Sequence, residues 1–132
     1  MSDYDKAYFD FHQRLLKAFI EQIQLQPPFC LENCSQEDKD FLTELNQLPN
    51  SGGNDYFIQG QQLLCKVVAS YPHLMPLLPR DLLWFFGGDC LHYMPDDEIA
   101  VYQRLDEQRQ EAQELGQPFS YEKARMSSMG LH

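Results

Sequence analysis

The sequence predicts an all-α protein that folds as a single compact domain over residues 1–132. Apolar residues recur every three or four positions in several segments, which is the period of an amphipathic helix. Proline and glycine separate these segments, and 132 residues with 43% hydrophobic side chains provide for one core rather than two. We therefore expect four or five helices, including an acidic helix near the C-terminus that projects along the surface.

The first expected helix covers residues 8–23. Its apolar stripe includes Phe11, Leu15 and Phe19, whereas charged residues occupy the opposite side. Oppositely charged residues four positions apart on that polar side indicate exposure to solvent, and each pair adds only about 0.2–0.5 kcal/mol. Pro27 and Pro28 prevent continuation of the helix, because proline lacks the amide hydrogen that a helical turn requires.

A second helix is expected to begin after Ser35. Serine is a favourable N-cap residue, and Asp38 three positions later approximates a capping box. Apolar residues from Phe41 onward continue one face as far as Pro49. Residues 49–54 are all Pro, Asn, Ser or Gly, so they predict a loop.

The third expected helix follows that loop. Helical spacing relates four apolar residues on one stripe, which are Phe57, Leu64, Val68 and Tyr71. Gly60 lies on the same stripe, and we expect another element to pack closely against it. The two valines at positions 67 and 68 leave a strand over residues 63–68 as an alternative.

Prolines at positions 72, 76 and 79 predict an extended or single-turn connector over residues 72–79. Pro79 suits the first turn of a further helix. Residues 81–86, Asp-Leu-Leu-Trp-Phe-Phe, are apolar nearly all round, so either the core or a partner should cover this element. Gly87 and Gly88 are expected to end it or to redirect the chain.

A last long helix is expected after Pro95. The acids at positions 96–98 favour a helix N-terminus, because negative charge complements the positive end of the helix dipole. Ile99, Tyr102 and Leu105 form a narrow apolar stripe, which thins out in the residues that follow. We expect this helix to end near Gly116, before a short piece over residues 119–129.

Charge and hydropathy exclude several classes of function. With 10 basic and 20 acidic residues, the chain has a formal charge of −10, so we expect no direct binding to nucleic acid or to an anionic membrane. The most apolar stretch, residues 74–86, is interrupted by prolines and charged residues, whereas a membrane span needs about 20 apolar residues. The N-terminal residues lack the features of an export signal, which predicts a cytoplasmic protein.

A cysteine and histidine site is one alternative function. Cys30 and Cys34 have a spacing found at zinc sites, and Cys90 with His92 could complete a tetrahedral set of ligands. The opposing interpretation is that the cysteines are reduced, apolar core thiols, as most free cysteines are. On balance we expect neither a metal nor another cofactor.

Two further patterns resemble catalytic groups only superficially. Asp89, Cys90 and His92 have the residue types of a cysteine nucleophile, its base and an orienting carboxylate. Such groups usually come from distant parts of a chain, so we expect Cys90 to be an inert thiol. A reactive Cys90 is the alternative. His12 lies on the first apolar stripe, where a hydrogen-bonded core histidine is more common than a ligand or a pH-sensitive group.

The function expected from the sequence is protein–protein interaction or regulation, without catalysis. Trp84, Phe85 and Tyr93 are of the residue types enriched at the centres of protein interfaces. The acids expected to steer a basic protein partner toward them are Asp96, Asp97 and Glu98. A second alternative is a DNA mimic, whose carboxylates occupy the nucleic-acid site of a basic protein. The sequence leaves the oligomeric state open.

Overall fold

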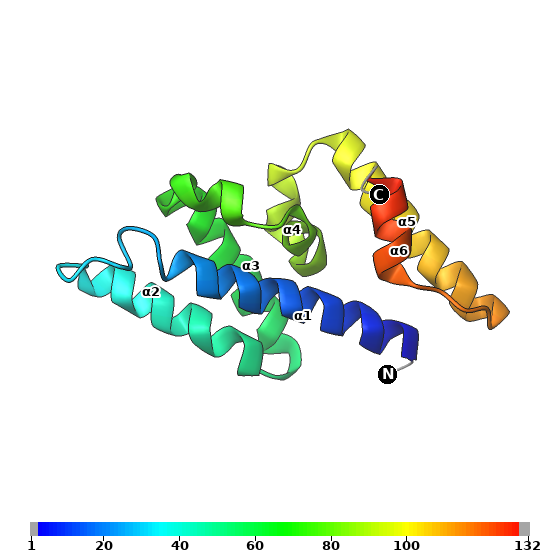
Figure 1. Cartoon of the computed structure of the whole chain (residues 1–132), viewed down its shortest axis with the longest axis horizontal. Helices are drawn as coiled ribbons and strands as arrows, with labels where there is room; N and C mark the ends of the chain where they lie inside the picture. The colour runs from blue at the N-terminus through cyan, green and yellow to red at the C-terminus, as the bar shows by residue number, and fades with distance from the viewer. Residues whose placement is uncertain (1–2, 130–132) are drawn as a thin grey trace.

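The protein is helical throughout, as Figure 1 shows for a computed structural model that describes residues 3–129. In chain order the elements are α1 (Asp3–Ile23), α2 (Gln36–Gln47), η1 (Leu48–Asn50), α3 (Gly53–Ser70), η2 (Pro72–Leu77), α4 (Arg80–Phe86), η3 (Gly88–Tyr93), α5 (Asp96–Leu115) and α6 (Tyr121–Ser128), where η denotes a 3-10 helix. The predicted all-α single domain is confirmed. The helix count is higher than expected, because residues 48–50, 72–77 and 88–93 wind into short 3-10 helices where connectors were expected.

The two N-terminal helices form where the sequence predicts them. α1 begins at Asp3, five residues earlier than expected, and ends at Ile23 before the two prolines. It buries Leu16 and Ile23 completely. α2 starts after Ser35, whose hydroxyl accepts a hydrogen bond from the amide of Asp38 at 3.1 Å. The predicted serine cap is therefore confirmed.

α3 starts inside the predicted loop, and its buried face matches the expected stripe at Gly60, Leu64 and Tyr71 but not at Phe57. Gly53 begins the helix with a φ of +68°, a conformation that glycine adopts without strain. Tyr56 and Leu63 are buried, whereas Phe57 remains 39% exposed. The placement of Phe57 in the core was wrong, because the stripe is rotated by one residue at this end. The strand alternative for residues 63–68 was also wrong, since the helix runs through them.

Gly60 is the point of closest approach between α3 and α4. A Cβ atom built on Gly60 would lie 2.2 Å from Cε1 of Phe86, well inside van der Waals contact. The Phe86 ring is 3% exposed, and it packs against Tyr56 with ring centroids 5.3 Å apart. The close packing predicted from a glycine on an apolar stripe is thus confirmed.

Gly60→Ala is expected to lower the free energy of unfolding by about 1–3 kcal/mol. Alanine favours a helix by about 1 kcal/mol over glycine, but the new methyl group displaces a ring that has little room to move. Urea unfolding followed by circular dichroism measures the change. Gln62→Ala, an exposed substitution in the same helix, is the control and should stay within about 0.5 kcal/mol of wild type. A stabilised Gly60→Ala protein would contradict the close packing.

Prolines and glycines shape the segment after α3. η2 ends at Leu77, and Pro79 forms the N-cap of α4, one position before the helix starts. Gly87 and Gly88 have φ values of +67° and +56°, and they turn the chain from α4 into η3 as predicted. Leu82 and Leu83 of α4 are completely buried, so the core covers most of this apolar helix.

α5 and α6 pack together at one end of the molecule, beside the N-terminal half of α1 (Figure 1). α5 buries Tyr102 and Leu105, and its later turns are exposed apart from Ala112 and the partly buried Arg109. Gly116 ends the helix with a φ of +65°. The predicted acidic helix along the surface is confirmed, although α6 covers part of it. Within residues 3–129, no helix combines the length and hydropathy that a membrane span requires.

Candidate functional site

The predicted aromatic anchor lies on α4, but its side chains point in different directions. Trp84 faces α5: its indole N–H donates to Oδ2 of Asp106 at 3.0 Å, and its ring stacks on Tyr102. The indole is partly buried. Through these contacts Trp84 joins α4 to α5, a role that the sequence did not predict. Because α5 covers part of the indole, little of its surface remains to act as an interface anchor.

Phe85 faces away from α5, toward α1 and α3. Its ring lies 5.3 Å from that of Phe57 and 5.9 Å from that of Phe9, measured between centroids. Phe9 and Phe85 are partly buried, Phe57 is 39% exposed, and the neighbouring Ile58 is 53% exposed. We call these four residues the α1–α3–α4 patch. It contains one of the predicted anchor residues and three that the sequence analysis missed.

Acidic residues come from the elements that form this patch. Asp5 precedes Phe9 by one helical turn on α1, and Asp55 precedes Ile58 by one turn on α3. Asp89 is exposed in η3, directly after the glycine turn that ends α4. The side chain of Asp5 is 45% exposed and pairs with Arg109 at 2.7 Å. Of these three acids, Asp55 and Asp89 are exposed, whereas Asp5 shares its charge with Arg109.

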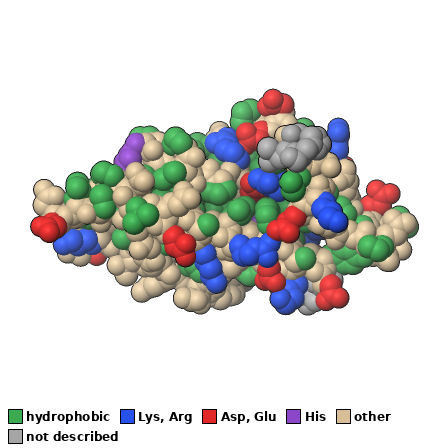
Figure 2. Space-filling view, viewed as in Figure 1, with side chains coloured by type: hydrophobic (Ala, Val, Ile, Leu, Met, Phe, Trp, Pro, Cys, Tyr) green, Lys and Arg blue, Asp and Glu red, His purple; other side chains and the backbone are tan. Residues whose placement is uncertain are grey.

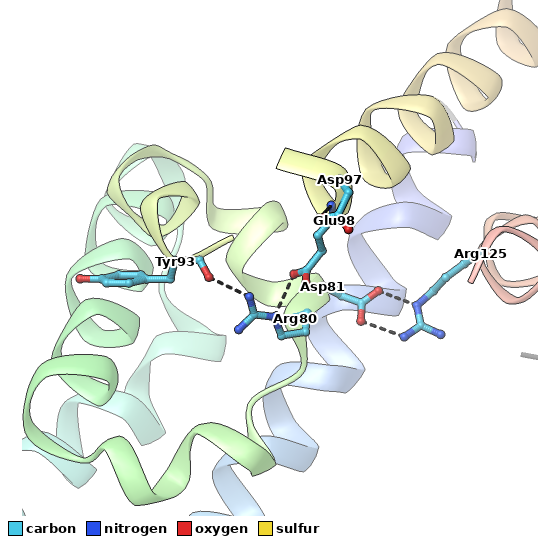
Figure 3. A network of polar contacts seen from close by, with 6 residues as sticks. All are labelled: Arg80, Asp81, Tyr93, Asp97, Glu98 and Arg125. Atoms are coloured by element: carbon cyan, nitrogen blue, oxygen red, sulfur yellow. Dashed lines mark hydrogen bonds and ion pairs between the residues drawn. The ribbon is translucent and has the colours of Figure 1, made fainter. Parts of the chain in front are cut away.

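Tyr93 and the acids at the start of α5 form the polar network drawn in Figure 3. The guanidinium of Arg80 donates to the carbonyl oxygen of Tyr93 at 2.7 Å and to Oε1 of Glu98 at 2.8 Å. Asp97 accepts a hydrogen bond from the amide of Glu98 at 3.0 Å, and both Asp96 and Asp97 are exposed. Glu98 is thus engaged by Arg80, and only the two aspartates remain as exposed acids that could act on a partner.

Figure 2 shows acidic and basic side chains interleaved across the middle and right of one face. Several of the acidic and basic side chains form ion pairs that join different helices. The basic residues that pair with an acid include Lys6, Arg14, Lys66, Arg80, Arg109 and Arg125. Because the chain has twice as many acids as bases, such pairing leaves an excess of acidic groups. The surface potential is therefore negative overall.

A buried ion pair holds α6 against α4. Asp81 is 2% exposed and accepts two hydrogen bonds from the guanidinium of Arg125, at 2.5 and 2.8 Å (Figure 3). A bidentate pair of this kind satisfies both carboxylate oxygens of a group that would otherwise be costly to bury. The hydrogen bond with Asp81 also raises the pKa of Arg125.

His12 is a core histidine, as predicted. It is 0% exposed, Nδ1 lies 2.8 Å from the carbonyl oxygen of Tyr8, and the imidazole stacks on Phe85 with an interplanar angle of 7°. Burial lowers its pKa from 6.5 to about 4, so the ring is neutral at pH 7. Because Nδ1 donates to Tyr8, Nε2 carries a lone pair, and this atom has no hydrogen-bond partner among residues 3–129.

His12 belongs to a group of buried polar residues around Tyr8 that the sequence analysis did not identify. The guanidinium of Arg109 lies 4.0 Å from the centroid of the Tyr8 ring, and the Tyr121 ring lies 5.0 Å away. Within the described part of the chain, Asp106 Oδ1, Arg109 Nε and the Tyr121 hydroxyl are also buried without hydrogen-bond partners. Internal water commonly satisfies such atoms. The group ties α1, α5 and α6 together.

The structure does not assemble the predicted cysteine and histidine site. Cys30 and Cys34 lie between α1 and α2, whereas Cys90 is completely buried in η3 and His92 is exposed. In the part of the chain that the structure describes, no three Cys, His, Asp or Glu side chains are grouped as metal ligands. Burial raises the pKa of Cys90 to about 12, so this thiol stays protonated at pH 7 and does not react directly with reagents in solvent. The neighbour of Cys90 is Cys65, which the sequence analysis did not single out.

Comparisons with known proteins identify a family but no function. Neither the curated proteins nor the solved structures gave a match. A family model described as PA2817-like matches residues 4–131, which is nearly the whole chain and every helix described above. The chain therefore belongs to the PA2817-like family.

Proposed function

We propose that this protein is a non-catalytic interaction protein that docks a basic protein partner through the α1–α3–α4 patch. The observation that carries the proposal is the 39% exposure of Phe57, whose ring lies 5.3 Å from that of the partly buried Phe85, together with the 53% exposure of Ile58, the next residue on α3. Aromatic and large aliphatic side chains that are already packed on one side lose little conformational freedom on binding. They are therefore suited to the centre of an interface.

Charge indicates the chemistry of the partner. Asp55 on α3 and Asp89 in η3, directly after α4, are exposed acids, and the whole chain carries a charge of −10. A basic partner would be attracted over long range and would then bury its apolar residues on the patch. Asp96 and Asp97, which remain exposed, would add to this attraction. The proposal keeps the predicted docking mechanism and moves its apolar centre from Trp84 to the exposed side of Phe85.

The two alternatives have less support. A metal or thiol site at Cys90 and His92 would need an accessible thiol, but Cys90 is 0% exposed. A DNA mimic would bind through carboxylates alone, and an apolar patch would be incidental to it. The docking proposal uses both the acids and the patch, so it accounts for more of the observed surface.

Ile58→Glu is expected to weaken capture of the basic partner from the protein's own cells at least tenfold. The substitution places a charge on α3 directly after Phe57, and tenfold corresponds to about 1.4 kcal/mol of binding free energy. Capture on the immobilised protein, followed by quantitative mass spectrometry, measures the loss. Because Ile58 is half exposed, the variant should keep the circular dichroism spectrum of wild type.

Leu115→Glu provides a matched control, since Leu115 is 61% exposed at the far end of α5. This variant should capture the partner as wild type does, and capture by both proteins should weaken as salt rises. Equal binding by Ile58→Glu and wild type would overturn the docking site. Retained capture with a steep salt dependence in both variants would instead favour the DNA mimic.

A further inference from the structure

Two cysteines meet where α3 packs against η3. The thiol of Cys90 donates a weak hydrogen bond to the carbonyl oxygen of Gln61, with a sulfur to oxygen distance of 3.8 Å. In an α-helix this carbonyl also accepts the amide hydrogen of the residue four positions later, which is Cys65. The Cys90 sulfur therefore lies against the helical turn that carries Cys65. The Cys65 thiol is close enough to contribute to the raised pKa of Cys90.

The joint between α3 and η3 is tightly packed. The side-chain amide of Gln61 donates to the carbonyl oxygen of Phe86 at 2.9 Å. A Cβ atom built on Gly88 would lie 2.5 Å from Oε1 of Gln61, so the chain approaches Gln61 as closely as glycine permits. These contacts fix the start of η3 on α3 and hold Cys90 in place.

Tyr93 completes the surroundings of the pair. Side chains three residues apart on a 3-10 helix are eclipsed, so Cys90 and Tyr93 extend from the same side of η3. The nearby Cys65 thiol also raises the pKa of Tyr93. In Figure 3 the Tyr93 ring extends away from Arg80, and its carbonyl oxygen is the group that Arg80 binds. Tyr93 is 37% exposed, which places the pair near the surface.

The two thiols differ in their access to solvent. Cys65 is partly exposed, whereas Cys90 is 0% exposed. Burial, followed by the proximity of Cys65, raises the pKa of Cys90 to about 12. A small reagent dissolved in water therefore reaches Cys65 first, while Cys90 stays protonated beside it.

We propose that Cys65 and Cys90 form a dithiol site that a hydroperoxide oxidises to an intramolecular disulfide. The Cys65 sulfur attacks the terminal oxygen of the peroxide, the O–O bond breaks, and Cys65 becomes a sulfenic acid with release of water or an alcohol. The Cys90 sulfur then attacks the Cys65 sulfur. The S–O bond breaks, and the hydroxyl leaves as water with the proton of Cys90. Overall, two thiols lose two electrons and two protons, and one peroxide is reduced.

Formation of this bond would join α3 covalently to η3. The site is independent of the α1–α3–α4 patch, so failure of the docking proposal would leave this one unaffected. A dithiol reductant reverses the reaction, because exchange with the disulfide restores both thiols. The protein would thus carry a reversible oxidation site that uses hydrogen peroxide or an organic hydroperoxide.

Intact mass spectrometry of the full chain treated with hydrogen peroxide tests the proposal. We expect a loss of about 2 Da, which dithiothreitol reverses, and a non-reducing peptide map that joins the peptides of Cys65 and Cys90. Addition of about 16 or 32 Da without a linkage would overturn the proposal. A linkage between Cys30 and Cys34 as the sole product would also overturn it.

Variants separate this pair from the other cysteines. Cys65→Ser, made together with Cys30→Ser and Cys34→Ser, should abolish the 2 Da loss, and the partial exposure of Cys65 makes the substitution tolerable to the fold. The matched control is the double variant Cys30→Ser and Cys34→Ser, which should form the disulfide at the wild-type rate. Persistence of the loss in the triple variant, or its absence in the control, would contradict the assignment. The peptide map of the peroxide-treated wild-type chain identifies the linked cysteines without any variant.

Discussion

Arg125→Met is expected to lower the free energy of unfolding by about 3–5 kcal/mol, because it leaves the carboxylate of Asp81 buried without its partner. Asp81 is 2% exposed, and both of its oxygens accept hydrogen bonds from Arg125. Methionine keeps much of the apolar length of arginine, so the change removes mainly the charge. Urea unfolding measures the loss, and hydrogen exchange should show it first in α6.

A surface ion pair that also involves α6 provides the control. Arg14 and Glu122 join α1 to α6, but their side chains are 64% and 56% exposed. Arg14→Met should therefore cost about 1 kcal/mol or less. The double variant Asp81→Leu and Arg125→Met should recover most of the stability that Arg125→Met loses, because no unpaired charge remains. If Arg125→Met costs no more than Arg14→Met, the buried pair does not hold α6.

Protonation of His12 is expected to remove about 3 kcal/mol of stability between pH 7 and pH 4. Its pKa in the folded protein is about 4, below the value of 6.5 in the unfolded chain. The unfolded state therefore binds the proton first as pH falls. The contribution is fully present above about pH 6.5 and is lost as pH falls toward 4, at about 1.4 kcal/mol for each pKa unit. Burial is the main cause, and the charges facing the ring are those of Asp81, Arg109 and Arg125.

The measurement compares urea unfolding of wild type and His12→Phe at several pH values between 4.5 and 7. Phenylalanine keeps a ring stacked on Phe85 but cannot bind a proton. Wild type should lose more stability than the variant over this range, while acidic residues affect both proteins alike. The exposed His92 gives the control, since His92→Gln should follow wild type. Parallel pH profiles for wild type and His12→Phe would contradict a buried, neutral His12.

Periodicity and capping predicted the fold well because those signals are local. Ser35 caps α2, and Gly60 meets another helix, as the sequence indicated. The position of Phe57 was predicted incorrectly, because tertiary contacts with α4 decide which adjacent row of α3 is buried. The 3-10 helices η1 and η3 were missed, and η2 was anticipated only as an extended or single-turn connector.

The candidate site was less predictable because its residues come from distant positions. Asp81 and Arg125 are 44 residues apart, and nothing in the sequence links them. Trp84 was correctly singled out as unusual, but the amphipathic pattern could not show that α5 would cover it. Cys65 was overlooked because its proximity to Cys90 depends on how η3 folds back on α3. Contacts of this kind follow from the tertiary arrangement and have no local signal.

Site-specific photo-crosslinking in the protein's own cells tests the docking proposal most directly. A photoreactive residue in place of Ile58 lies in the α1–α3–α4 patch, and one in place of Leu115 lies on an equally exposed surface away from it. Our account predicts that position 58 captures one basic protein and that position 115 does not. Equal capture at both positions, or capture at position 115 alone, would contradict docking through the patch.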